Sequence, residues 1–158
     1  LEKAAAESPE QQELAARLKG QVAIASARMA YRRQHEMFRS PRFAALAERG
    51  AQVQRPLWAS TSVKNPAFSD VKYVEALIGP NTVTTLPVET LDAYRDHGKP
   101  AIRVDEDPKG SERILAMLAE AGIDLDAVTQ ELEEQGIEKF NKPFDSLMTA
   151  LEKAARAA

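Results

Sequence analysis

Residues 55–87 read RPLWASTSVKNPAFSDVKYVEALIGPNTVTTLP, and this stretch decides the fold. Its first part, RPLWAST (55–61), is short, lacks helical spacing and is bounded by prolines, which predicts a buried strand. NTVTTLP (81–87) is rich in β-branched residues and is stopped by a proline, which predicts a second short strand. The segment between them has helical spacing. Strand–helix–strand alternation with short connections implies a parallel sheet with a right-handed crossover.

The helices around these strands have recognisable boundaries. The helix between the strands can be capped by Asn65 or Ser69 and is closed by Gly79 and Pro80. A further helix follows the second strand over about residues 89–97. The middle of the chain therefore predicts strand, helix, strand and helix in succession.

The first fifty residues predict helices. Ser8 is the expected N-cap of the first, with Pro9 and Gln11 completing a capping-box pattern, and Gly20 weakens this run without having to end it. A second helix is expected over residues 40–50. Residues spaced by three and four predict one stripe facing the core. Its members are Leu14, Leu18, Val22, Ala25, Met29 and Arg33.

The last third of the chain predicts three more helices. One is capped by Ser111, one by Asp124, and one has Pro143 in its first turn. The acidic VDEDPKGSE (104–112) before them is expected to be a solvated turn. Two short strands cannot cover so many helices, so we expect a fragment whose missing strands lie upstream of Leu1.

Composition excludes several classes of function. The chain has 158 residues, is 44% hydrophobic and 28% charged, and carries a net charge of -3, without a basic stripe that would indicate a nucleic-acid surface. It contains no cysteine, which excludes disulfides and thiolate catalysis and fits the cytosol. We expect neither a membrane span nor a signal peptide.

Candidate chemistry gathers where the two strands end. Hydroxyl groups follow both strands, and Lys64 follows the first, which suits an oxyanion such as phosphate. Three readings of Lys64 stay open, namely a charge clamp, a Schiff-base nucleophile and a solvated loop residue. His35 and His97 show no metal-site spacing, and a cation at a helix C-terminus explains His97 without a function. No metal site is expected.

Three segments resemble one known family. GQVAIASARMAY (20–31), residues 54–87 and TLDAYRDHG (90–98) are similar to the C-terminal part of transaldolases. The resemblance is to the branch with actinobacterial and cyanobacterial enzymes, some of them fused to a glucose-6-phosphate isomerase domain. It implies an α/β fold: the C-terminal part of a (β/α)8 TIM barrel, with strands 7 and 8 plus flanking and C-terminal helices. As a fragment, residues 1–158 would be mostly helical and belong to one barrel domain.

The resemblance also implies a reaction. Transaldolases transfer a dihydroxyacetone unit between sugar phosphates through a lysine Schiff base, in the pentose phosphate pathway, without cofactor or metal. The implied partners are sedoheptulose 7-phosphate, glyceraldehyde 3-phosphate, fructose 6-phosphate and erythrose 4-phosphate, in the cytoplasm. No lysine of this chain matches the Schiff-base lysine, so no catalytic residue is assigned and the fragment alone is expected to be inactive.

By the same resemblance, Ser62 and Lys64 match the pair that binds the substrate phosphate after the seventh strand, where relatives often have arginine in place of the lysine.

Two alternatives to the transaldolase function remain. One is a fructose-6-phosphate aldolase-like class I aldolase of the same barrel group, and the other is a non-catalytic helical interaction module.

Overall fold

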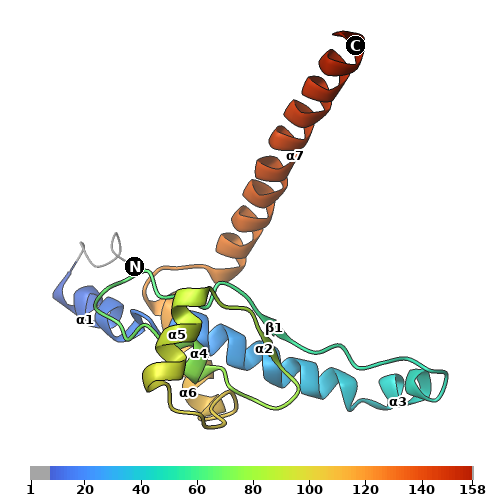
Figure 1. Ribbon diagram of the computed structural model, residues 1–158. Helices are drawn as coiled ribbons and strands as arrows, with labels where there is room; N and C mark the ends of the chain where they lie inside the picture. Colours follow the sequence, from blue (N-terminus) through green and yellow to red (C-terminus); the bar gives the residue numbers. More distant parts are fainter. Residues whose placement is uncertain (1–7, 158) are drawn as a thin grey trace. The chain divides into compact units, whose positions relative to one another are not determined.

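The computed structural model describes residues 8–157, and the chain forms two compact units, residues 1–117 and 118–158. Helices dominate the described residues, and one short sheet lies in the first unit (Figure 1). The elements are α1 (Pro9–Leu18), α2 (Val22–Phe38), α3 (Pro41–Ala47), β1 (Leu57–Trp58), α4 (Lys72–Ala76), β2 (Val83–Thr84), α5 (Val88–His97), α6 (Pro108–Glu120) and α7 (Leu125–Ala157).

The two strands pair in parallel, as the strand–helix–strand pattern predicts. Leu57 lies opposite Val83 and Trp58 opposite Thr84. Each strand has two residues, which is much shorter than the expected ranges 55–61 and 81–87. The ladder stops early because the chain turns away after Trp58 into an irregular loop. The parallel pair within a mostly helical chain agrees with the expected fold class at this coarse level.

The helix between the strands begins later than expected. Its N-cap is Val71, which provides no side-chain hydrogen bond. Asn65 instead closes a local turn, since its Oδ1 accepts a hydrogen bond from the Ala67 amide at 2.9 Å. Ser69 contributes its carbonyl oxygen, which accepts from the Lys72 amide at 3.0 Å. The prediction of a side-chain cap at Asn65 or Ser69 is therefore wrong, and α4 has only five residues.

Gly20 divides the N-terminal helical run into α1 and α2, so it does more than weaken the run as expected. Ser8 caps α1 as predicted, accepting from the Gln11 amide at 3.2 Å. Gly20 has φ +74, in the left-handed region that glycine tolerates, and a Cβ there would lie 2.6 Å from Cζ of Phe68. The close approach of Phe68 and the positive φ explain why glycine occupies this position.

This break changes which residues face the core. Leu18 and Ala25 are buried as expected, whereas the side chain of Arg33 is 76% exposed. A single helical stripe cannot run through Gly20, because the turn there resets the phase of α2. On α2 the buried residues are Ile24, Ala25 and Tyr31.

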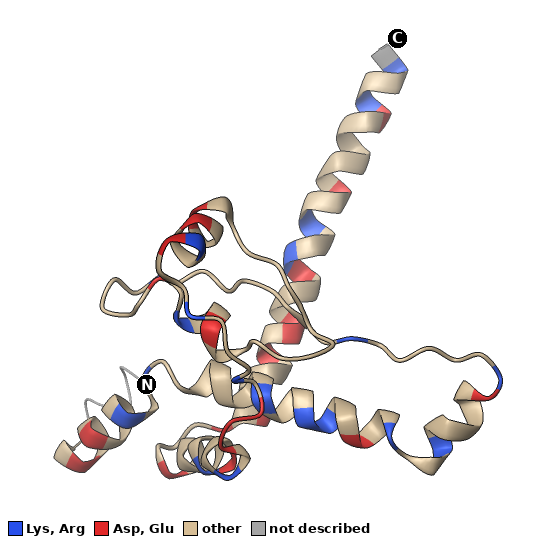
Figure 2. Ribbon diagram, turned by 60° about the horizontal axis from the view of Figure 1, so that its bottom comes forward, with Lys and Arg blue, Asp and Glu red and all other residues tan. Residues whose placement is uncertain are grey.

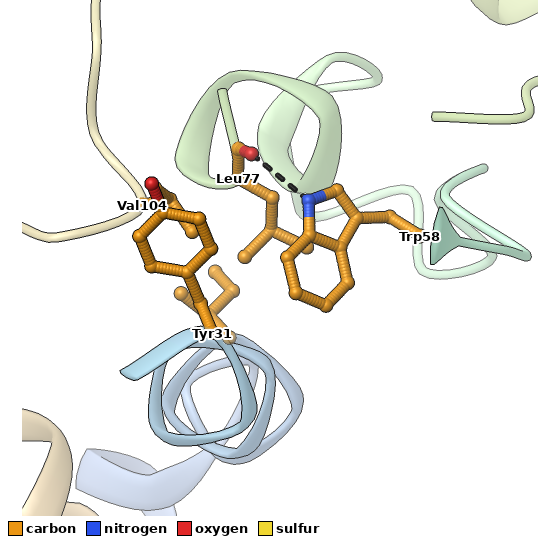
Figure 3. Packing of buried hydrophobic residues seen from close by; sticks show 5 residues of the cluster. Tyr31, Trp58, Leu77 and Val104 are labelled. Atoms are coloured by element: carbon orange, nitrogen blue, oxygen red, sulfur yellow. Dashed lines mark hydrogen bonds between the residues drawn. The ribbon is translucent and has the colours of Figure 1, made fainter. Parts of the chain in front are cut away.

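The core of the first unit forms where α2 meets β1, α4 and the segment after α5 (Figure 3). Ile24 and Tyr31 pack with Trp58, Leu77 and Val104, which is 1% exposed. The Trp58 indole N–H donates to the Leu77 carbonyl oxygen at 3.1 Å, so its one polar group is satisfied within the core. Trp58 thus fixes β1 against the end of α4.

The solvated turn expected over residues 104–112 is only partly confirmed, because the turn ends at Asp107, residues 108–112 already belong to α6, and Val104 is buried. The cap of α6 also differs from the predicted one. α6 begins at Pro108, and Oδ1 of Asp107 accepts from the Gly110 amide at 2.9 Å. Ser111 lies inside the helix, is buried, and donates its hydroxyl to the Asp107 carbonyl oxygen at 3.3 Å. The prediction of Ser111 as cap is wrong because Asp107 supplies the earlier cap.

The second unit contains one long helix in place of the two that were expected. Asp124 caps it as predicted, since its Oδ1 accepts from the amides of Asp126 and Ala127. α7 then continues for 33 residues, with Pro143 inside it and not in a first turn. Many apolar side chains of α7 are exposed to solvent. They are Val128, Leu132, Ile137, Phe140, Phe144, Leu147, Met148 and Leu151.

Candidate functional site

The loop after β1 carries the predicted hydroxyls and the lysine. It leaves the strand through Ser60, whose φ of +55 lies in the left-handed region. The next residue, Thr61, is only 2% exposed, while Ser62 is half-buried and Lys64 is exposed. The chain therefore turns inward at Thr61 and outward again by Lys64.

Thr61 anchors this loop to the end of the second strand. Its Oγ1 donates to the Thr85 carbonyl oxygen at 2.9 Å. In return, the Thr85 amide donates to the Trp58 carbonyl oxygen at 2.9 Å, and the Thr85 hydroxyl lies 3.4 Å from the same oxygen. These bonds join the carboxyl ends of the two parallel strands, the edge where sites of βα folds assemble.

The hydroxyl cluster therefore divides into two parts. The hydroxyl groups of Thr61 and Thr85 donate hydrogen bonds to backbone carbonyl oxygens, so these two residues have a structural role. Nothing in the sequence distinguished them from their neighbours, because a run of three hydroxyl residues gives no indication of which one turns inward. Ser60 and Lys64 are exposed, and Ser62 is half-buried.

Ser62 and Lys64 lie on the same open loop, as predicted. Among the described residues, neither side chain forms a hydrogen bond or an ion pair within the chain. Four surface cavities of about 300 to 590 Å³ lie elsewhere in the first unit, and Ser62 and Lys64 line none of them. The loop thus carries an exposed ammonium group and a half-buried serine that have no side-chain partner within the described part of the chain.

A helix N-terminus does not add to this site. α4 begins at Lys72, eight positions after Lys64, and is a single short turn of helix. The helix dipole acts only within the first turn. The N-terminus of α4 is therefore too far along the chain to support an oxyanion next to Lys64.

The two histidines have structural partners. Nδ1 of His35 lies 3.1 Å from the Tyr31 carbonyl oxygen. His97 ends α5, and its Nε2 lies 2.9 Å from Oδ1 of Asp70, while its Nδ1 lies 3.1 Å from Oδ2 of Asp96. Hydrogen bonds that the Asp70 carboxylate and then the Asp96 carboxylate accept from the ring raise the pKa of His97. Neither histidine reaches the loop that carries Lys64 through any of these contacts.

Basic and acidic residues both occur along the helices (Figure 2). Within residues 8–157, three or more His, Asp or Glu side chains nowhere gather in a way that could hold a metal ion. The helices of this described part are also too short or too polar to cross a membrane.

The chain is similar to known proteins over most of its length. A family model described as Transaldolase/Fructose-6-phosphate aldolase matches residues 2–151. The transaldolase of Trichodesmium erythraeum is 46% identical over 141 residues, which cover 88% of this chain and 37% of that protein. The transaldolase of Mycolicibacterium smegmatis is 46% identical over 142 residues, which cover 89% of this chain and 38% of that protein.

A third relative, transaldolase 2 of Nostoc sp. (strain PCC 7120), is 47% identical over 137 residues, which cover 85% of this chain and 36% of the relative. The chain thus spans little more than a third of the length of the curated relatives it matches. The resemblance to transaldolases is confirmed. Since the family model covers most of its residues, the chain belongs to the transaldolase/fructose-6-phosphate aldolase family.

Proposed function

We propose that residues 1–158 are the C-terminal portion of a single transaldolase barrel domain, with β1 and β2 as its seventh and eighth strands. The share of the relatives that the chain covers supports this proposal. So does the sheet itself: a parallel pair is stable only when neighbouring strands and helices cover it. Leu57 in β1 is 54% exposed, which fits a position that further parts of a barrel would cover.

The proposed reaction is the transfer of a dihydroxyacetone unit from a ketose phosphate to an aldose phosphate. The observation that carries it is the 46% identity to proteins named transaldolase. The Schiff-base lysine belongs to another strand of the barrel, because no lysine of this chain matches it. The whole protein uses fructose 6-phosphate or sedoheptulose 7-phosphate as donor in the pentose phosphate pathway, in the cytoplasm and without a cofactor. Residues 1–158 alone are inactive.

In this proposal Ser62 and Lys64 hold the phosphate of the sugar. The loop presents an ammonium group and a hydroxyl at the carboxyl edge of the parallel strands, where barrel enzymes place phosphate sites after strands seven and eight. Lysine supplies a point charge and not the bidentate fork of arginine. The hydrogen bond from Thr61 to Thr85 positions this loop relative to the second strand.

A coupled assay tests the reaction. The protein that contains this chain within its whole barrel receives fructose 6-phosphate with and without erythrose 4-phosphate. A transaldolase forms sedoheptulose 7-phosphate and glyceraldehyde 3-phosphate only with the acceptor present. Release of glyceraldehyde 3-phosphate at the same rate without the acceptor would instead indicate a fructose-6-phosphate aldolase, the other activity in the name of the matching family. No turnover in either assay would favour the helical interaction module.

A further inference from the structure

A second group of cations lies around a cavity of about 430 Å³ in the first unit, lined by parts of α2 and α4 and by the segments that precede α4 and follow α5. Three of its lining residues are the cations Arg28, Lys72 and Arg103, and one is the acid Glu75. Its volume lies in the range of about 300–1,000 Å³ that is usual for small-molecule sites. Ser62 and Lys64 do not line it.

Neutral groups orient all three cations. Nη2 of Arg28 donates to the Arg103 carbonyl oxygen at 2.9 Å, and Nη1 of Arg103 donates to the Lys99 carbonyl oxygen at 2.7 Å. Nζ of Lys72 lies 4.4 Å from the centroid of the Phe68 ring. Carbonyl oxygens and an aromatic face hold these side chains in place without cancelling their charge.

The acids nearby compensate these charges only in part. Oε2 of Glu106 lies 3.6 Å from Nη2 of Arg28, and the Glu106 side chain is 57% exposed, so solvent screens this pair. Oε1 of Glu75 accepts a hydrogen bond from the Lys99 amide at 2.7 Å, which takes up one of its oxygens. The lining keeps an excess of positive charge.

Arg28 makes this excess of positive charge costly. Its side chain is only 18% exposed, and its Nε is buried without a hydrogen-bond partner among the described residues. A buried cation with an unsatisfied donor is unfavourable unless an anion offsets it. Fixed cations that remain undercompensated favour binding of an anion, because little ordering is needed when it arrives.

We propose that this cavity is a second anion site, which binds a phosphate dianion, either free or esterified to a small molecule. Two guanidinium groups and one ammonium group match the several acceptor oxygens of a phosphate, and the Ser69 hydroxyl also lines the cavity. This inference does not rest on the transaldolase reaction, because none of its residues belongs to the loop of Ser62 and Lys64.

Titration of the ¹⁵N-labelled protein, with its whole barrel, tests the site. Inorganic phosphate is one arm and glycerol 3-phosphate the other, each at constant ionic strength with chloride as the reference, while NMR follows the backbone amides and the arginine Nε–H groups. We expect saturable shifts at Arg28, Lys72 and Arg103. A lower dissociation constant for glycerol 3-phosphate identifies a phosphate ester as the ligand, and a lower dissociation constant for inorganic phosphate identifies the free ion.

Two substitutions separate the contribution of each cation. Lys72→Gln and Arg103→Gln should each weaken phosphate binding by about tenfold, as expected for a lost charged hydrogen bond. The backbone N–H of Arg103 donates to Ile78, so the substitution leaves this backbone contact intact. Arg95→Gln is the matched control, since Arg95 is 74% exposed and does not line the cavity. Lys64→Gln should leave these shifts unchanged.

Three results would overturn the proposal. Binding by both Lys72→Gln and Arg103→Gln with wild-type affinity would exclude the cavity. Shifts confined to residues 59–65 would assign phosphate to the loop alone. Equal shifts with chloride would show only a general salt effect.

Discussion

Replacement of Thr61 tests whether the two strand ends are joined by the hydroxyl bond that positions the loop. Thr61→Val keeps the shape of the side chain but removes the donor to the Thr85 carbonyl oxygen, 2.9 Å away. We expect a loss of about 1 kcal/mol in the free energy of unfolding, the usual net worth of such a bond. Thr61→Ser keeps the bond and removes a buried methyl group, which also costs about 1 kcal/mol.

Thr61→Ala removes both groups, so it should cost about 2 kcal/mol, the sum of the two changes. Urea unfolding measures these differences through the fluorescence of Trp58, which is the only tryptophan of the chain and lies in the same unit as Thr61. A Thr61→Val chain as stable as wild type, alongside a destabilised Thr61→Ser chain, would refute the reasoning. That result would mean that Thr61 contributes packing and that its hydroxyl does not hold the loop.

Two further predictions concern the backbone and pH. Gly20→Ala should lower the free energy of unfolding in urea by well over 1 kcal/mol, because it adds left-handed backbone strain and a clash with Phe68. Gly50 has φ +93 and nothing within 4 Å of an added Cβ, so Gly50→Ala should cost only the strain of about 1 kcal/mol. Equal losses in the two variants would contradict the clash. The hydrogen bond to Asp70 raises the pKa of His97. The stabilisation of the fold by protonated His97 is therefore complete below the ordinary histidine pKa near 6.5, and it is lost as the pH rises through the raised pKa. His97→Asn should remove this pH dependence from the thermal midpoint measured between pH 5 and 9, and an unchanged profile would contradict the assignment.

The sequence predicts much of the local structure because caps and strand composition act over a few residues. Ser8 and Asp124 cap their helices as expected, and the parallel strands lie within the two expected segments, the first bounded by prolines and the second rich in β-branched residues. These signals depend on the residue itself and its nearest neighbours. They survive in the folded chain because tertiary contacts do not oppose them.

Other features depend on contacts between distant residues. Gly20 ends a helix because Phe68, far along the chain, packs against it, and no local pattern reveals that approach. The inward turn of Thr61 likewise depends on the Thr85 carbonyl oxygen. The continuous α7 contradicts a local rule, since Pro143 removes a hydrogen-bond donor inside the helix.

Ser62 and Lys64 lie on the loop after the first strand, and their role as a phosphate site stays a prediction. Residue types alone indicated an oxyanion, and the resemblance selected Ser62 and Lys64. The sequence could not show that two of the neighbouring hydroxyls are used internally. Nor did it indicate the cations around the second cavity, because Arg28, Lys72 and Arg103 lie far apart in the sequence.

The most direct test of the central claim is the affinity of the protein, with its whole barrel, for fructose 6-phosphate measured by calorimetry. If the Lys64 ammonium holds the phosphate, Lys64→Gln should weaken binding by about tenfold or more, while Lys64→Arg should retain most of it. Lys109→Gln, an exposed lysine of α6, is the matched control and should bind as wild type does. Wild-type affinity in Lys64→Gln would contradict the claim that this loop holds the phosphate.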